Sequence, residues 1–136
     1  MILADTSAWT EFDRATGSPV DCRVAELIDA DGPLATTAPV VMEVVAGARD
    51  DARELHLRHL LQRFELLAFD AAVDFDGAAR VYRRCRAAGV TPRGMIDCMI
   101  AAVAWRLDAT LLAQDVDIAR IAGVIGIATD DAMPRP

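Results

Sequence analysis

The sequence predicts an α/β sandwich with a central, mainly parallel sheet, built as one domain. Four short apolar runs are separated by segments long enough to form helices, which is the pattern of strands joined by helical crossovers. The chain has 136 residues, of which 54% are hydrophobic and 26% are charged, as in a single globular domain. A domain of this length can hold its core by packing alone. We therefore expect residues 1–136 to fold as one unit.

The strands are expected where the apolar runs lie, at Ile2–Ala4, Leu34–Thr36, Leu66–Ala68 and Thr110–Ala113. Six helices are expected between and after them, at Ser7–Arg14, Val20–Ala30, Pro39–Ala46, Asp51–Phe64, Ala71–Ala88 and Ile96–Leu107. Pro39 suits the first position of a helix, and Gly47 and Gly89 suit helix ends. The last stretch, at 129–136, contains two prolines and a pair of aspartates, which predicts a frayed tail.

The composition excludes several classes of protein. No apolar run approaches the roughly 20 residues of a membrane span, and no basic segment precedes a long apolar one, so we expect a soluble, cytoplasmic protein without a secretory signal. The cysteines Cys22, Cys85 and Cys98 are odd in number and lack C-x-x-C spacing, which disfavours a disulfide framework or a zinc knuckle. The formal charge is −7, and all 14 basic residues are arginines. Without lysine, a P-loop or Schiff-base mechanism is excluded.

Four acidic residues lie at positions where a carboxylate could serve a functional site. Asp5 follows the first predicted strand directly, and Asp115 follows the last one after a single residue. The carboxyl ends of parallel strands border the crevice where ligands bind. Glu43 lies in an otherwise apolar helix, and Asp97 opens another, where the helix dipole favours an anion. Each acid alone is also explained by a structural role, such as a helix cap, an ion pair or a solvated turn.

If the sheet gathers these carboxylates, they lie within a few ångströms of one another. Like charges at that distance cannot all stay ionised without a counter-cation. With only oxygen ligands available, the expected cation is hard and divalent, Mg²⁺ or Mn²⁺ rather than zinc or copper. Such ions activate water for attack on a phosphodiester, so the acids together predict a nuclease. A metal site at His56 and His59, spaced i, i+3, is disfavoured because no third ligand is evident.

Four runs of the chain carry a family resemblance when taken in order: Ile2–Trp9, Pro39–Gly47, Ile96–Ala102 and Gln114–Asp117. The set resembles the PIN domains, and within them the VapC-type ribonuclease toxins of bacterial toxin–antitoxin pairs. The resemblance implies a PIN-like three-layer α/β/α sandwich and a metal-dependent endoribonuclease, the toxin component of a type II toxin–antitoxin system. The chain departs from the family's pattern around the fourth acid, where Ala113 and Ile118 replace a frequent polar and a frequent aromatic residue.

Carried over position by position, the resemblance implies four catalytic acids: Asp5, Glu43, Asp97 and Asp115. It implies that Mg²⁺ or Mn²⁺ is held among the aspartates Asp5, Asp97, Asp115 and Asp117. The hydroxyl of Thr6 or of Ser7 would orient the Asp5 carboxylate, because a ligand held by a hydrogen bond keeps its geometry.

The partners implied by the resemblance are an RNA, such as a transfer or ribosomal RNA, a small VapB-like antitoxin in the active-site groove, and a second copy of the chain. Arg93 stands just ahead of a proposed ligand, so we expect it to contact RNA. The arginines at 80–86 either position the RNA backbone or form a solvated helix face. The apolar stripe at 57–64 and the pair Trp9 and Phe12 are either core or a groove for an antitoxin segment.

Two other functions fit parts of the pattern. A PIN-like module that binds RNA or a protein without cutting would keep the same acids, so the sequence leaves it open. A phosphotransfer or phosphatase domain with Asp5 as phospho-acceptor is disfavoured, because the lysine such domains use is missing. Cys98, in an apolar run, is expected to be a small buried side chain rather than a nucleophile.

Overall fold

The computed structural model describes residues 1–136 and contains a four-stranded sheet. Its strands are β1 (Ile2–Ala4), β2 (Leu34–Thr37), β3 (Glu65–Leu67) and β4 (Thr110–Leu112). They lie in the order β3-β2-β1-β4, and every neighbouring pair is parallel. The prediction of an α/β fold around a parallel sheet is confirmed. All four strands therefore end at the same edge of the sheet.

The helices are α1 (Thr6–Arg14), α2 (Pro19–Asp29), α3 (Ala38–Ala46), α4 (Asp51–Leu61), α5 (Asp74–Ala87), α6 (Met95–Leu107) and α7 (Val116–Ile125). Six of them match predicted helices to within three residues at each end. The seventh, α7, is missing from the sequence prediction. Its signal is nevertheless present, because its buried residues recur at helical spacing: Ile118, Ile121, Ala122 and Ile125.

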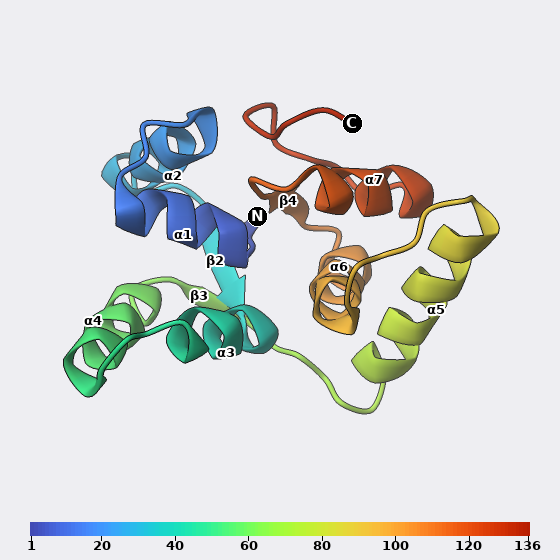
Figure 1. Cartoon of the computed structure of the whole chain (residues 1–136), viewed down its shortest axis with the longest axis horizontal. Coiled ribbons are helices and arrows are strands. Elements are labelled where there is room, and N and C mark those ends of the chain that lie inside the picture. Colours follow the sequence, from blue (N-terminus) through green and yellow to red (C-terminus); the bar gives the residue numbers. More distant parts are fainter.

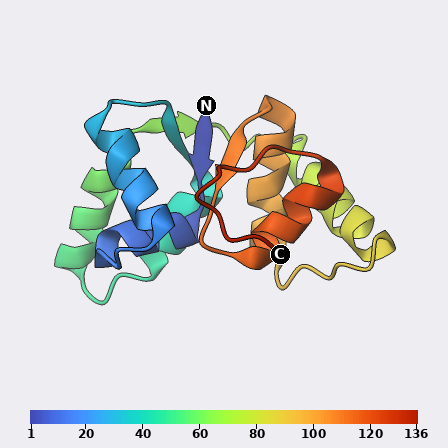
Figure 2. The ribbon, with the colours of Figure 1, turned by 90° about the horizontal axis from the view of Figure 1, so that it is seen from above.

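The helices flank the sheet on both sides and form two groups (Figures 1 and 2). In Figure 1, α1 to α4 lie around β2 and β3, whereas α5 to α7 lie beyond β4. Within the groups α1 packs on α2, α3 on α4, and α5 on both α6 and α7. Helix α3 also contacts α1 in its own group and α6 in the other, which brings three helices together beside the sheet. None of these helices has the length and apolar character needed to cross a membrane.

A main core of 24 buried residues fills the space between the sheet and its helices, and a second cluster of 8 lies between α5, α6 and α7. Trp9 is only 1% exposed, and its ring packs on Phe64 with the ring centroids 5.1 Å apart. Leu57 and Leu61 are buried in the same core. The apolar stripe at 57–64 therefore packs on the core, with Leu60 and Phe64 only partly buried, and a groove for an antitoxin segment stays a prediction. Cys98 is buried with a free thiol, as the sequence predicts.

The segment after α7 is packed, so the prediction of a frayed tail at 129–136 is wrong for most of its length. The Asp130 amide donates to the Leu111 carbonyl at 2.8 Å, and the Asp130 carboxylate pairs with Arg23 at 3.0 Å. Met133 is 6% exposed and belongs to the main core. The physical reason is that β4 is an edge strand, whose free backbone groups this segment partly covers.

Candidate active site

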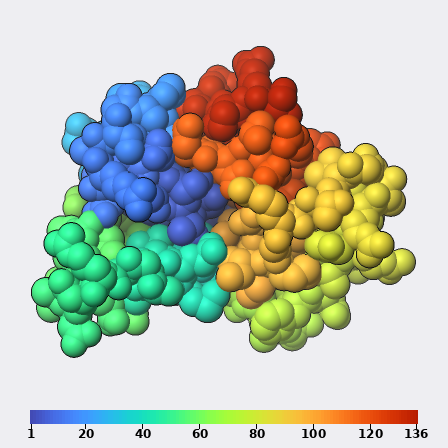
Figure 3. Space-filling view, viewed as in Figure 1, coloured from blue at the N-terminus to red at the C-terminus, as the bar shows by residue number.

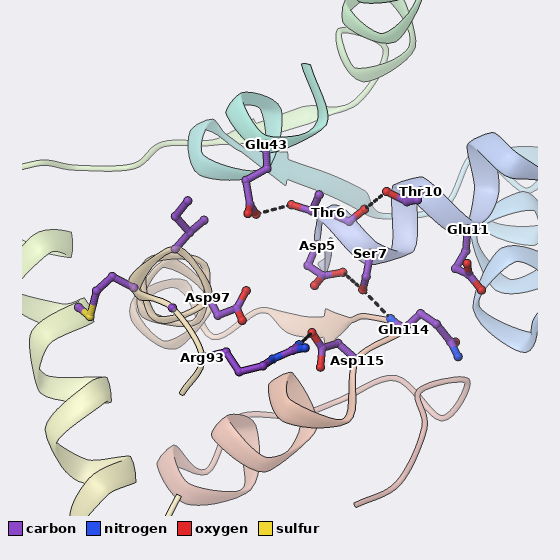
Figure 4. A pocket seen from close by; sticks show the side chains of 13 residues that line it. Asp5, Thr6, Ser7, Thr10, Glu11, Glu43, Arg93, Asp97, Gln114 and Asp115 are labelled. Carbon is purple, nitrogen blue, oxygen red and sulfur yellow. Dashed lines mark hydrogen bonds and ion pairs between the residues drawn. The ribbon is translucent and has the colours of Figure 1, made fainter. Parts of the chain in front are cut away.

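A cavity of about 620 Å³ opens at the carboxyl ends of the strands, where α1, α3 and α6 meet (Figure 3). It is lined by all four acids that the sequence singles out: Asp5, Glu43, Asp97 and Asp115. Figure 4 shows their side chains reaching this space from four separate parts of the fold. Convergence of the four acids on one cavity is therefore an observation, whereas their catalytic roles stay predictions.

Asp5 is the deepest of the acids. It follows β1 and caps α1, so its carboxylate accepts hydrogen bonds from the Ala8 amide at 3.0 Å and from the Ser7 hydroxyl at 2.7 Å. The residue as a whole is only 3% exposed to solvent. The pKa of Asp5 is raised from 3.8 to about 7: burial is the main cause, the charges of Asp97 and Asp115 contribute, and the two hydrogen bonds act in the opposite direction. A nearby positive charge would stabilise the ionised form of this buried carboxyl group.

Two hydroxyl groups hold two different acids. Ser7 donates to Asp5, and the Ser7 oxygen also accepts the Gln114 amide at 2.8 Å, which ties the start of α1 to the end of β4. Thr6 instead donates to Oε1 of Glu43 at 2.6 Å. The sequence leaves open whether Thr6 or Ser7 orients Asp5, and the structure places Ser7 there. The backbone bond to Gln114 leaves no signal in the sequence, because any residue at that position could supply it.

Asp97 lies in the first turn of α6, and its carboxylate points into the cavity (Figure 4). The pKa of Asp97 is raised from 3.8 to about 6, chiefly by burial and then by the charges of Asp115 and Glu43. The positive charge of Arg93 acts in the opposite direction. Burial is thus the main cause of the raised pKa of both Asp97 and Asp5, and neighbouring carboxylates add the smaller contribution that the sequence predicts for a site that gathers these acids.

Arg93 lines the cavity on the side of Asp115, the residue that caps α7. Its Nη2 lies 2.5 Å from Oδ2 of Asp115, and its Nε lies 2.6 Å from Oδ2 of Asp117. Asp117 also pairs with Arg120 at 2.8 Å and does not line the cavity. Arg93 therefore serves here as a counter-ion to two acids. The sequence predicts an RNA contact for it and does not foresee this pairing, since α7 is missing from the predicted elements.

The chemistry of the lining suits a hard cation better than a soft one. The candidate ligands are carboxylate oxygens, and neither histidine nor cysteine lines the cavity. The structure contains no group of three or more His, Cys, Asp or Glu side chains arranged to hold a metal ion. The sequence-based expectation that the carboxylates lie within a few ångströms of one another is therefore too strong for this conformation, in which Arg93 holds Asp115. His56 and His59 lie on α4 and do not line the cavity.

Comparison with known proteins agrees with the site. Residues 2–124 match the family model described as PIN domain. The chain belongs to the PIN-domain family. Ribonuclease VapC11 of Mycobacterium tuberculosis and VapC ribonuclease Mb1587 of Mycobacterium bovis are each 41% identical to it over 128 residues, which cover 93% of this chain and 96% of each relative. This PIN domain is thus a member of the VapC ribonuclease group.

The PIN domain is also similar to a solved structure. The crystal structure of VapBC2 from Rickettsia felis, bound to a DNA fragment from their promoter, matches with a TM-score of 0.73 and 20% identity. The match covers 96% of this chain and 98% of the other. At this identity the likeness shows the fold alone, and it confirms the predicted PIN-like α/β/α sandwich.

Proposed function

We propose that this chain is a metal-dependent endoribonuclease, the toxin component of a type II toxin–antitoxin system. The observation that carries the proposal is the convergence of the four acids on one cavity in a chain 41% identical to proteins named VapC ribonucleases. Hydrolysis of a phosphodiester at such a site needs oxygen ligands for a divalent ion and a group that accepts the proton of the attacking water. The cavity offers candidates for both.

We assign the ligands of Mg²⁺ or Mn²⁺ to Asp5, Asp97 and Asp115, with Asp117 as a nearby fourth carboxylate. The raised pKa values of Asp5 and Asp97 agree with this assignment, because they arise from burial and, to a smaller extent, from the charges of neighbouring carboxylates, both of which a bound cation would offset. When bound, the ion would supply a polarised water and a positive charge for the leaving oxygen. Arg93 competes with any cation for Asp115. The ion pair between Arg93 and Asp115 must therefore break before Asp115 can bind a metal ion.

The chain's own residues position the reacting groups. Ser7 fixes the orientation of Asp5 by a hydrogen bond of 2.7 Å. Thr6 binds Oε1 of Glu43, which leaves Oε2 free to accept a proton from the attacking water. Once Asp115 is engaged elsewhere, Nη2 of Arg93 is free to contact a phosphate oxygen while Nε stays paired with Asp117, because Arg93 lines the same cavity and its side chain is 65% exposed.

The proposed substrate is a transfer or ribosomal RNA, and the proposed regulator is a small VapB-like antitoxin that occupies the active-site groove. The solved relative from Rickettsia felis is described as VapBC2, which supports a protein partner of this kind. A homodimer of the chain completes the proposed assembly. An arginine from the antitoxin could neutralise the acids, as Arg93 does within this chain.

The decisive experiment removes one acid without changing its shape. Asp5→Asn should abolish cleavage of cellular RNA in Mg²⁺ or Mn²⁺ while the fold stays intact, because a neutral amide is a poor ligand for a hard cation. Asp131→Asn, an equal change of charge on an exposed residue of the C-terminal segment, should leave cleavage unchanged. Addition of a chelator should stop RNA cleavage by the unsubstituted chain. RNA ends mapped in cells that make the free protein would identify the cleaved RNA.

The same experiment separates the enzyme from a module that only binds. The absence of a ready group of metal ligands favours such a module. RNA binding by the unsubstituted chain with no cleavage in either metal would establish binding alone and end the proposal of an endoribonuclease. Full activity of Asp5→Asn would contradict the assigned roles in a different way, since cleavage would then use other residues.

A further inference from the structure

The positive charge of this acidic chain is concentrated in one segment. Residues 77–107 contain six arginines and one aspartate, a formal charge of +5. Since the whole chain carries −7, all other residues together carry −12. A polyanion such as RNA is therefore repelled by most of the molecule and attracted by this segment.

The outward face of α5 displays most of this charge. Four exposed arginines lie on it, and none of them forms an ion pair with an acid: Arg80, Arg83, Arg84 and Arg86. The opposite face of the helix is buried through Ala78, Val81 and Cys85, so the arginines face solvent. We call these four residues the α5 arginine face. Unpaired guanidinium groups keep all their donors available for phosphate oxygens.

Two of the arginines are held in place without losing their charge. The guanidinium of Arg84 lies 5.0 Å from the ring centroid of Trp105, and that of Arg86 lies 5.9 Å from the ring centroid of Tyr82. Such contacts restrict the side chain while its N–H groups remain open to a ligand. The fixed side chains then lose less conformational entropy when they bind a phosphate.

Helix α5 is linked to the candidate active site both by packing and by the chain that follows it. Helix α5 packs along α6, which carries Asp97. The chain that follows α5 leads to Arg93 and Gly94, both in the lining of the cavity. Figure 3 shows the yellow atoms of this segment next to the gold start of α6, on the same face as the cavity. From Arg80 to Arg86 the helix rises about 9 Å, so the charge extends along a strip from which residues 87–92 lead to Arg93 in the cavity.

We propose that the α5 arginine face binds the RNA backbone on one side of the cleaved phosphate. The inference rests on the proposed function and adds a direction of approach for the substrate. An RNA strand suits this face better than a protein, because no large apolar side chain is exposed between Arg80 and Arg93. Protein interfaces need a desolvated apolar centre, whereas a phosphate backbone needs only spaced cations.

The test compares two triple variants that remove the same charge. Arg80→Gln/Arg83→Gln/Arg86→Gln removes three cations from α5, and Arg49→Gln/Arg63→Gln/Arg135→Gln removes three exposed cations elsewhere. Both are made in an Asp5→Asn background, so that RNA stays uncut during binding. The probes are fluorescent oligouridines of about 20 and about 4 nucleotides, of which only the longer one reaches beyond the cavity.

We expect the α5 variant to bind the longer probe about tenfold more weakly. The slope of log Kd against log salt should fall by about 2, because each single-strand phosphate contact contributes about 0.7. The short probe and the control variant should show no change. An equal loss in both variants, or an equal loss for both probes, would overturn the proposal. Loss of antitoxin binding with RNA binding retained would also overturn it, in favour of a protein surface.

Failure of the proposed function would appear in a separate readout. With Asp5 restored, an unsubstituted chain that binds the longer probe through α5 yet never cuts RNA would refute the nuclease and leave the RNA-binding face standing. Cleavage by the unsubstituted chain, together with an α5 variant whose RNA affinity is unchanged, would refute the RNA-binding face and leave the nuclease standing. Circular dichroism of each variant checks that exposed Arg→Gln changes leave the helices folded.

Discussion

Ser7 and Thr6 are neighbours in the sequence and yet hold two different carboxylates. The first donates to Asp5 and the second to Glu43, because successive residues at a helix start point in different directions. Ser7 does more than orient its acid, since its oxygen also accepts the Gln114 amide. A single hydroxyl therefore connects the end of β1 with the end of β4, at the point where the two strands deliver acids to the cavity.

The Ser7 hydroxyl should be needed for metal affinity. Ser7→Ala removes the donor to Asp5 and leaves the Gln114 amide without its partner, so we expect Mn²⁺ to bind about tenfold more weakly or worse. The free energy of unfolding should fall by about 1 kcal/mol. Titration calorimetry with Mn²⁺ and chemical denaturation measure the two effects.

Ser18→Ala is the matched control. Ser18 caps α2 by accepting the Asp21 amide at 3.1 Å and does not line the cavity. Its loss should lower stability by about 1 kcal/mol as well, while Mn²⁺ affinity stays the same. A similar loss of affinity in both variants would mean that Ser7 acts through general stability and not by positioning Asp5.

At the scale of elements, the segment after α7 closes the open side of the sheet. It pairs with β4 through Leu111 and reaches α2 through the Arg23 ion pair. Met133 inserts into the main core at the end of this path. The segment thereby joins the two groups of helices, which otherwise meet mainly through the sheet and through α3.

Truncation of Met133 should cost stability without touching the chemistry. Met133→Ala leaves a void in the main core and should lower the free energy of unfolding by about 2 to 3 kcal/mol. Met42→Ala makes the same change at a side chain that is 51% exposed, and its effect should stay within about 0.5 kcal/mol. Denaturation of both variants measures this. Equal effects would show that the segment contributes nothing to the core and is frayed after all.

At the scale of the whole molecule, an acidic chain keeps two carboxyl groups partly protonated. The pKa of Asp5 is raised to about 7 and that of Asp97 to about 6, in both cases chiefly by burial. A carboxyl whose pKa is higher in the folded state than in the unfolded one stabilises the fold fully below its unfolded pKa of 3.8. That stability is lost as the pH rises through the folded values, here between about 6 and about 7.

The stability of the metal-free protein should therefore fall with rising pH in this window. We expect the contribution of these two groups to lower Tm between about pH 5 and about pH 8, and Asp5→Asn to reduce this drop because it removes the buried charge. Added Mg²⁺ should raise Tm more at the higher pH, where its ligands are deprotonated. Calorimetric scans at the two values measure this. A metal-induced shift that is larger at low pH would contradict the assigned ligands.

The sequence determined all the strands and six of the seven helices, and it singled out the acids that line the cavity. The apolar runs predict four strands, and the resemblance to PIN domains selects the four acids that line the cavity. These features are local, because periodicity and motif order are written along the chain. The one helix missing from the prediction, α7, follows directly on the acidic motif of Asp115 and Asp117. Its apolar residues have helical spacing, but they follow two acids that the sequence analysis assigns to the site.

Only the tertiary structure decided how the acids are held. It placed Ser7 on Asp5 and Thr6 on Glu43, paired Arg93 with Asp115, and packed the C-terminal segment against β4. Apart from the local bond between Ser7 and Asp5, these contacts join groups that lie far apart in the chain, and their partners are chosen by the packing of whole elements. No local pattern carries that information, since a hydroxyl, a guanidinium or a backbone amide can bind any acceptor that the fold brings within reach.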